Sequence, residues 1–168
     1  MRIFAAKVAV SLLTCLALLL VLPSAGETHT KSSSYSRWNL EQGAQGDLRT
    51  AAVQIRLPLL ELTRFPNGHD WPKYLQEQLR LIAGNQSCTA SRPVRQAQAP
   101  TGWAIFRWKV ECPAAGPLTL RSDVLGDVLS SHLHFARVAN PAGEIRERVL
   151  VAGTPEWALD TPAGQSEE

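Results

Sequence analysis

Two histidines spaced two residues apart, His132 and His134, are the side chains of this chain best placed to do chemistry. Alternate residues of a β-strand point to the same face, so both imidazoles would lie side by side. Imidazole nitrogen is a good ligand for Ni, Cu or Zn ions, and the pair therefore indicates part of a transition-metal site. His29 is the candidate third ligand, and close to a new amino terminus it would suit Cu(II) or Ni(II). The competing interpretation is that these histidines are hydrogen-bonded or solvated side chains that bind no metal.

No sequence pattern indicates an enzyme. The chain has no GxSxG nucleophile elbow, no HExxH zinc motif and no glycine-rich phosphate loop. Asp123 and Asp127 lie close together, but two acids near a turn are usually solvated caps. We therefore predict a domain that is not catalytic.

The amino-terminal residues have the pattern of an export signal. Arg2 and Lys7 precede an uncharged apolar run over residues 8–22, and residues 23–26 then supply a helix break and small side chains. We predict a signal peptide over residues 1–25, cleaved after Ala25 or Gly26, and a periplasmic mature protein; an uncleaved anchor is the alternative. No lipid anchor is expected, because Cys15 lies inside the apolar run.

Removal of this segment changes the charge of the chain. The 168 residues include 17 Lys and Arg against 15 Asp and Glu, and the predicted signal peptide removes Arg2 and Lys7 but no acid, which leaves 15 of each sign. A net charge of zero offers no basic stripe to neutralise phosphates, so no nucleic-acid partner is predicted. The sequence carries no indication of an oligomeric state.

Two cysteines, Cys88 and Cys112, remain in the predicted mature chain. An even pair in an oxidising compartment predicts one disulfide. Closure of a loop of about 25 residues stabilises a fold by roughly 3 kcal/mol in the chain-entropy model.

The pattern of apolar residues predicts a mainly β domain. Residues 103–112 alternate strictly, with Trp108 and Cys112 on the inward face, and residues 48–60 alternate almost as well. One helix is predicted after an Asp70 cap, with Leu75, Leu79 and Ile82 on one face. Further strands are predicted at 35–40, from 118, at 132–138 and at 146–151. The five tryptophans are interpreted as core or rim packing.

These elements predict one domain, an immunoglobulin-like β-sandwich of about six to eight strands with one inserted helix and one disulfide. The expected boundaries are a flexible lead-in at 26–34, the sandwich at 35–160 and a disordered tail at 161–168.

Four segments taken together resemble one protein family. They are residues 29–38 (HTKSSSYSRW), 106–113 (FRWKVECP), 121–127 (RSDVLGD) and 131–138 (SHLHFARV), of which the last is the most specific. In order and spacing they are similar to the amino-terminal extracytoplasmic domain of HupE/UreJ-like bacterial membrane proteins. The resemblance implies a soluble domain that precedes a bundle of transmembrane helices, in a family linked to nickel or cobalt uptake.

The chain departs from that family because it ends without a membrane half. It is expected either to be a standalone relative that acts beside a separately encoded membrane protein or to be a truncated product. We therefore predict an accessory or binding domain that takes a transition metal through His132, His134 and His29. The alternative is a protein-interaction module that docks on a membrane partner through its sheet edge or exposed aromatic residues, without metal chemistry.

Overall fold

The computed structural model describes residues 31–42, 49–113 and 116–160. The predicted signal peptide, His29 and the predicted tail lie outside these ranges. Within them, no helix is long and apolar enough to cross a membrane.

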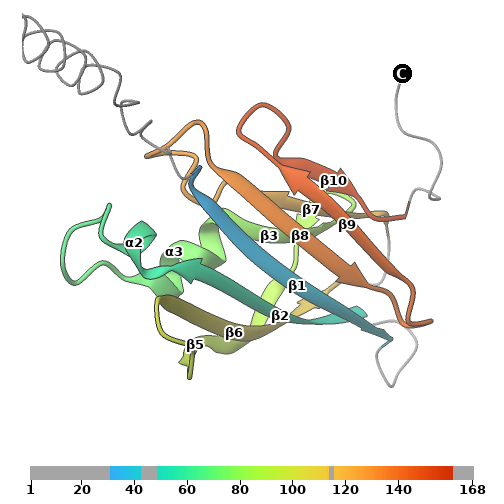
Figure 1. Cartoon of the computed structure of the whole chain (residues 1–168). Coiled ribbons are helices and arrows are strands. Elements are labelled where there is room, and N and C mark those ends of the chain that lie inside the picture. Colours follow the sequence, from blue (N-terminus) through green and yellow to red (C-terminus); the bar gives the residue numbers. More distant parts are fainter. Residues whose placement is uncertain (1–30, 43–48, 114–115, 161–168) are drawn as a thin grey trace, which may run out of the picture. The chain divides into compact units, whose positions relative to one another are not determined.

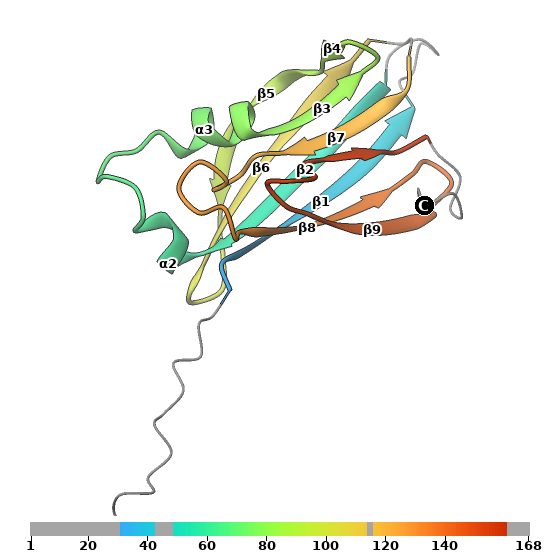
Figure 2. The same ribbon diagram turned by 90° about the horizontal axis from the view of Figure 1, so that it is seen from above.

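In the described ranges ten strands form two sheets, which face each other in the view of Figure 2. The larger sheet has six strands in the order β5-β6-β2-β1-β8-β9, and the smaller has four in the order β10-β7-β3-β4. The strands of the larger sheet are β1 (Ser33–Gln42), β2 (Arg49–Pro58), β5 (Thr89–Ala97), β6 (Trp103–Cys112), β8 (Leu133–Ala139) and β9 (Ile145–Leu150). Those of the smaller sheet are β3 (Leu79–Ala83), β4 (Gln86–Ser87), β7 (Leu118–Ser122) and β10 (Glu156–Ala158).

The core lies between the sheets because every long strand buries alternate residues. On β6 the even-numbered residues from Ala104 to Cys112 are buried, and on β2 the odd-numbered residues from Ala51 to Leu57 are buried. The smaller sheet contributes mainly leucines and Trp157. Trp108 packs edge-on against Trp38 with ring centroids 6.4 Å apart, which confirms the prediction that Trp108 belongs to the core.

The first strand lies in the middle of the larger sheet. β1 pairs with β2 in the antiparallel direction and with β8 in the parallel direction, and Figure 1 shows it between these two neighbours. The parallel register places Ser34 beside His134 and Arg37 beside Arg137. This pairing joins residues about a hundred positions apart and positions both of the sites described below.

The predicted helix is partly wrong. Helix α3 (Trp71–Gln78) begins at the predicted cap, where the Asp70 carboxylate accepts a hydrogen bond from the Lys73 amide at 3.1 Å. It ends before Leu79, which opens strand β3. Alternate burial of Leu79, Leu81 and Ala83 against the core overrides the helical spacing of the leucines. A second, four-residue helix, α2 (Leu59–Leu62), was not predicted.

The mainly β prediction is confirmed, although the strand count exceeds the predicted six to eight. Four strands were not predicted. β3 was taken for the end of the helix, and β4, β5 and β10 are short or poorly buried and so carry little apolar alternation. β1 begins at Ser33, inside the predicted 26–34 lead-in, and β9 extends from residue 145 rather than 146.

The predicted disulfide is confirmed. It joins Cys88 to Cys112, 24 positions apart in the chain. Cys88 lies where the chain passes from β4 of the smaller sheet to β5 of the larger one, and Cys112 is the buried last residue of β6. The bond therefore ties the crossover between the sheets to the best-packed strand.

We expect the double variant Cys88→Ala with Cys112→Ala to lose about 3 kcal/mol of unfolding free energy, because the unfolded chain regains the entropy of the open loop. Urea denaturation measures this loss. A reductant should destabilise the wild type by a similar amount and leave the variant unchanged. Equal stability of the variant and the oxidised wild type would contradict the expectation.

Candidate functional site

Three serines and two histidines form a buried hydrogen-bonded chain at the seam between β1 and β8. The serines are Ser32, Ser34 and Ser36, spaced so that all three face the core beside the two histidines. Ser32 Oγ lies 2.7 Å from His132 Nδ1, and Ser34 Oγ lies 2.8 Å from His132 Nε2. Ser34 Oγ also lies 2.7 Å from His134 Nδ1, and Ser36 Oγ lies 2.8 Å from His134 Nε2. Every imidazole nitrogen of the pair thus has a hydroxyl partner.

Trp38 supplies a donor at one end of this chain. Its indole Nε1–H, which can only donate, donates to Ser36 Oγ at 3.0 Å. Neutral rings suit these contacts: Ser36 can donate to His134 Nε2 while His134 Nδ1–H donates to Ser34, and the same pattern can repeat at His132. In this assignment every hydroxyl and every ring nitrogen has a partner.

Burial also favours the neutral rings. Desolvation lowers the pKa of His132 from its ordinary 6.5 to about 4; Glu61 opposes this shift and Arg64 adds to it. Desolvation lowers the pKa of His134 to about 3, with a smaller contribution from the charge of His132. A proton on either ring would be buried without a carboxylate partner in the hydrogen-bonded chain, which is the physical cause of both shifts.

The predicted metal pair therefore lies in one place, but its nitrogens are occupied. The two histidines share a face as predicted and are 3% and 2% exposed. Among the residues that the structure describes, no group of three or more His, Cys, Asp or Glu side chains is arranged to hold a metal ion. Metal binding by His132 and His134 stays a prediction, and it requires an ion to displace serine hydroxyls from a closed seam.

A small cavity of about 250 Å³ borders the histidines and is lined by Ser122, Asp123 and Asp127. The two aspartates are held more firmly than solvated caps would be. Asp127 accepts a hydrogen bond from the Tyr74 hydroxyl at 2.9 Å, and Asp123 pairs with Arg121 at 2.7 Å. Burial raises the pKa of Tyr74, so its hydroxyl keeps the proton that it donates.

The loop beside this cavity is held by the same tyrosine. The Leu125 amide donates to the Tyr74 hydroxyl at 2.8 Å, and Leu125 is fully buried with a φ of 59°. A left-handed leucine is a strained conformation that persists only where packing enforces it. The tyrosine and the leucine anchor therefore hold the aspartates in place.

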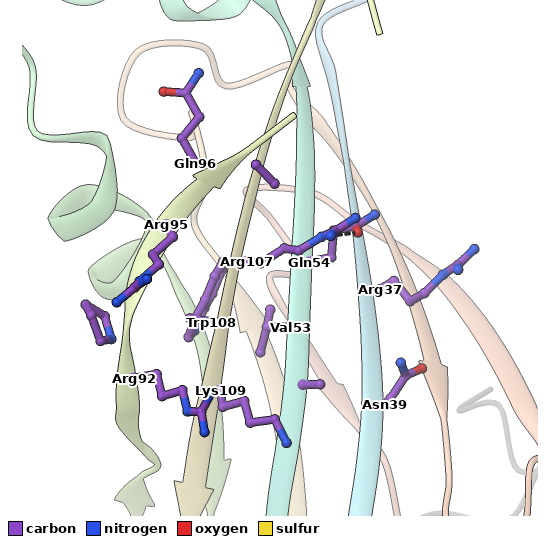
Figure 3. A pocket seen from close by; sticks show the side chains of 13 residues that line it. Arg37, Asn39, Val53, Gln54, Arg92, Arg95, Gln96, Arg107, Trp108 and Lys109 are labelled. Atoms are coloured by element: carbon purple, nitrogen blue, oxygen red, sulfur yellow. Dashed lines mark hydrogen bonds between the residues drawn. The ribbon is translucent and has the colours of Figure 1, made fainter. Parts of the chain in front are cut away.

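The second candidate site is a groove of about 800 Å³ on the outer face of the larger sheet, shown in Figure 3. Its lining contains five cationic residues and no acidic residue: Arg37, Arg92, Arg95, Arg107 and Lys109. The side chains come from β1, β5 and β6; β1 and β6 alternate between core and solvent, whereas β5 is mostly exposed. We call this surface the basic face.

Strand register lines the arginines up across the sheet. Arg95 lies opposite Arg107, Arg107 opposite Gln54, Gln54 opposite Arg37, and Arg37 opposite Arg137. Four strand intervals of roughly 4.8 Å make this row about 19 Å long. Like charges directly opposite each other on a sheet are destabilising. The row therefore lowers the stability of the domain, and neutral residues at these positions would allow the same fold.

Counter-charges are few along this row. Arg137 lies 3.6 Å from Glu147, and in the next row Lys109 lies 3.5 Å from Glu41. Over the described ranges, Arg37 and Arg95 have no ion-pair partner, and Arg107 donates only to the neutral Gln54, at 2.8 Å. The basic face is therefore a positive surface on a chain whose predicted mature charge is zero.

An aromatic row flanks the arginines. Tyr35 stacks on Phe135 with ring centroids 5.1 Å apart, and its ring meets Trp103 edge-on at 5.9 Å. The Arg56 guanidinium lies 4.5 Å from the centre of the Tyr35 ring and 4.9 Å from that of Trp103. These rings therefore contact one another and a cation.

The basic face was missed from the sequence, where the equal numbers of acids and bases suggested that no basic stripe exists. That inference was wrong for the folded chain, because the strand register gathers arginines from positions 37, 95, 107 and 137. The cations of one strand could have been predicted to face solvent, because Arg107 and Lys109 alternate with the buried residues of β6.

Comparison with models of known protein families, and with curated proteins, found no match.

Protonation of the buried histidines should make stability depend on pH. Both folded pKa values lie below 6.5, so the unfolded chain binds more protons, and stability should fall as the pH decreases from about 6.5 towards 4. Each histidine contributes a slope of up to about 1.4 kcal/mol per pH unit. Urea denaturation at several pH values measures it.

His134→Gln, which cannot titrate but can hydrogen-bond, should flatten this dependence. Val138→Ala, a core truncation on the same face of β8, is the matched control, and it should lower stability at every pH without changing the slope. An unchanged slope in His134→Gln would show that the histidine is not the titrating group.

The occupied imidazole nitrogens also give an expectation for metals. Titration of the purified protein with Ni(II), Cu(II) or Zn(II), followed by the histidine ring signals in NMR, should leave the His132 and His134 signals unshifted near pH 7. A shift of both signals at stoichiometric metal, abolished in His132→Ala, would instead establish the predicted metal pair.

Proposed function

We propose that this chain is an exported, non-enzymatic binding domain whose working surface is the basic face. The observation that carries the proposal is the row across the sheet in which strand register sets Arg95 beside Arg107 and Arg37 beside Arg137, with the neutral Gln54 between the two pairs. Repulsion along such a row is relieved when an anionic ligand lies on it, so a destabilising arrangement of the free domain becomes a favourable one in the complex.

The chemistry of the guanidinium group supports the same function. Arginine presents a rigid fork of donors that matches carboxylate, phosphate or sulfate oxygens in pairs. Several such groups on a β-sheet keep fixed spacings, because the strands beneath them are hydrogen-bonded to one another. The basic face is thus suited to a ligand with several negative charges.

The buried serine–histidine chain has a supporting role in this proposal. It holds β8 against β1, and these two strands carry Arg137 and Arg37 on their opposite, outer side. The immunoglobulin-like character of the sandwich and the kinship with HupE/UreJ-like proteins are further parts of the proposal, supported by the two facing sheets and by the quoted sequence segments respectively.

A second candidate function, docking on a separately encoded membrane protein, is favoured by the sheet edge. β9 is an edge strand of the larger sheet, and Ile145 and Val149 on it are 50% and 43% exposed. An open edge with apolar side chains can add a strand from another chain. Val149→Lys should prevent such docking in co-purification and leave anion binding unchanged.

The basic face is tested by removing two of its charges. In Arg37→Gln with Arg107→Gln we expect the affinity for inorganic polyphosphate to fall by about tenfold or more, as isothermal calorimetry at low salt would measure. The unfolding free energy should rise by about 0.5–1 kcal/mol, because like charges no longer face each other.

The matched control is Lys31→Gln with Lys73→Gln, which removes the same net charge from exposed residues outside the groove. This control should change neither the polyphosphate affinity nor the unfolding free energy by much. Equal loss of polyphosphate affinity in the two double variants would mean that net charge, and not the basic face, determines binding.

A further inference from the structure

The lining of the groove narrows the class of its ligand. Besides the cations it contains three amide side chains, Asn39, Gln54 and Gln96, and small apolar groups such as Ala52 and Pro93. A site for charge alone has no need of amides. Amides donate and accept hydrogen bonds at once, which is what neutral hydroxyl groups require.

The amides are interspersed with the arginines. Gln54 lies between Arg107 and Arg37 in the row across the sheet, and Asn39 lies on β1 two residues after Arg37. Gln54 accepts from Arg107 through its oxygen, so its NH₂ group stays free to donate. The order along the row is therefore cation, amide, cation, which matches a chain whose anionic groups are separated by hydroxyls.

Stacked nucleobases fit this surface less well. The rings nearest the arginine row, Tyr35 and Phe135, stack on each other, and Arg56 covers Tyr35 and Trp103. Trp108, the aromatic residue of the groove itself, is 5% exposed. Single-stranded nucleic acid is bound in other proteins by open aromatic faces, whereas here these rings are engaged with one another and with Arg56.

A bilayer surface also fits less well, because the cations line a hollow of about 800 Å³ rather than a projecting rim. A linear polymer can enter such a groove and follow the part of the row from Arg95 to Arg37, three strand intervals or about 14 Å. From charge complementarity, the interspersed amides and the hollow shape, we propose that the basic face binds an anionic polysaccharide, a chain of sugars that carries sulfate, phosphate or carboxylate groups.

This inference rests on the proposed function, and one pair of probes separates the two. Inorganic polyphosphate carries charge without hydroxyl groups, whereas a heparin fragment of similar total charge carries both. The wild-type protein should bind both probes and should bind heparin more tightly.

The decisive variant is Asn39→Leu with Gln96→Met, which keeps side-chain size and removes hydrogen bonding. It leaves Gln54 in place, because Gln54 holds Arg107. The loss of two neutral hydrogen bonds should lower the affinity for heparin about tenfold and leave the affinity for polyphosphate within about twofold of the wild-type value. Arg37→Gln with Arg107→Gln is the matched contrast and should weaken both probes. Unchanged thermal unfolding of the amide variant establishes that it folds; should it not fold, the wild-type preference for heparin over polyphosphate is the test.

Each outcome has one meaning. No binding of either probe by the wild type overturns the proposed function and the inference together. Binding of polyphosphate with no preference for heparin, or an equal loss of both probes in the amide variant, overturns the polysaccharide and leaves the basic face as an anion site. Tighter binding of an oligothymidylate than of heparin at matched charge overturns the polysaccharide proposal in favour of nucleic acid.

Discussion

The parallel contact between β1 and β8 is the constraint around which this domain is arranged. Its inner side buries two imidazoles against three hydroxyls and an indole, and its outer side brings Arg37 beside Arg137. A shift of one residue in this register would turn the histidines to solvent and the arginines into the core. The hydrogen-bonded chain therefore specifies the register on one side and the basic face on the other.

Polar groups take the place of apolar packing at this seam. Neighbouring stretches of the core use leucine, valine and tryptophan, which tolerate small displacements, whereas the serine–histidine chain requires each donor to meet one acceptor. Such a network specifies a single pairing of β1. The first five residues of this strand are polar apart from Tyr35, so the strand has little apolar pattern of its own. It also explains why neutral imidazoles are an integral part of the core.

The alternation over residues 103–112 predicted β6 to the residue, because one face of that strand is uniformly apolar. The helix after Asp70 was predicted too long, since Leu75, Leu79 and Ile82 fit a helical period while Leu79 and Leu81 also fit a strand. Burial in the smaller sheet decided between the two.

Local pattern identified the histidine pair and the cysteine pair. The partners of the histidines were not predictable, because Ser32, Ser34 and Ser36 have the strand period but not the hydrophobicity that makes the period visible. The arginine row was not predictable from the sequence either, because its members come together only through the pairing registers of five strands.

The position of β1 in the middle of the larger sheet has a consequence for the order in which the molecule can be assembled. Synthesis from the amino terminus delivers β1 before any other strand of the two sheets, yet its parallel partner is the eighth strand in sequence. Until β8 arrives, β1 can form only its antiparallel edge with β2, and three hydroxyls and an indole that end in the interior remain in contact with water. Such distant pairing is slow to form. Closure of the sandwich is therefore a late step of biogenesis that waits for nearly the whole polypeptide, and during this interval the unpaired edge of β1 is the segment that a chaperone would have to shield.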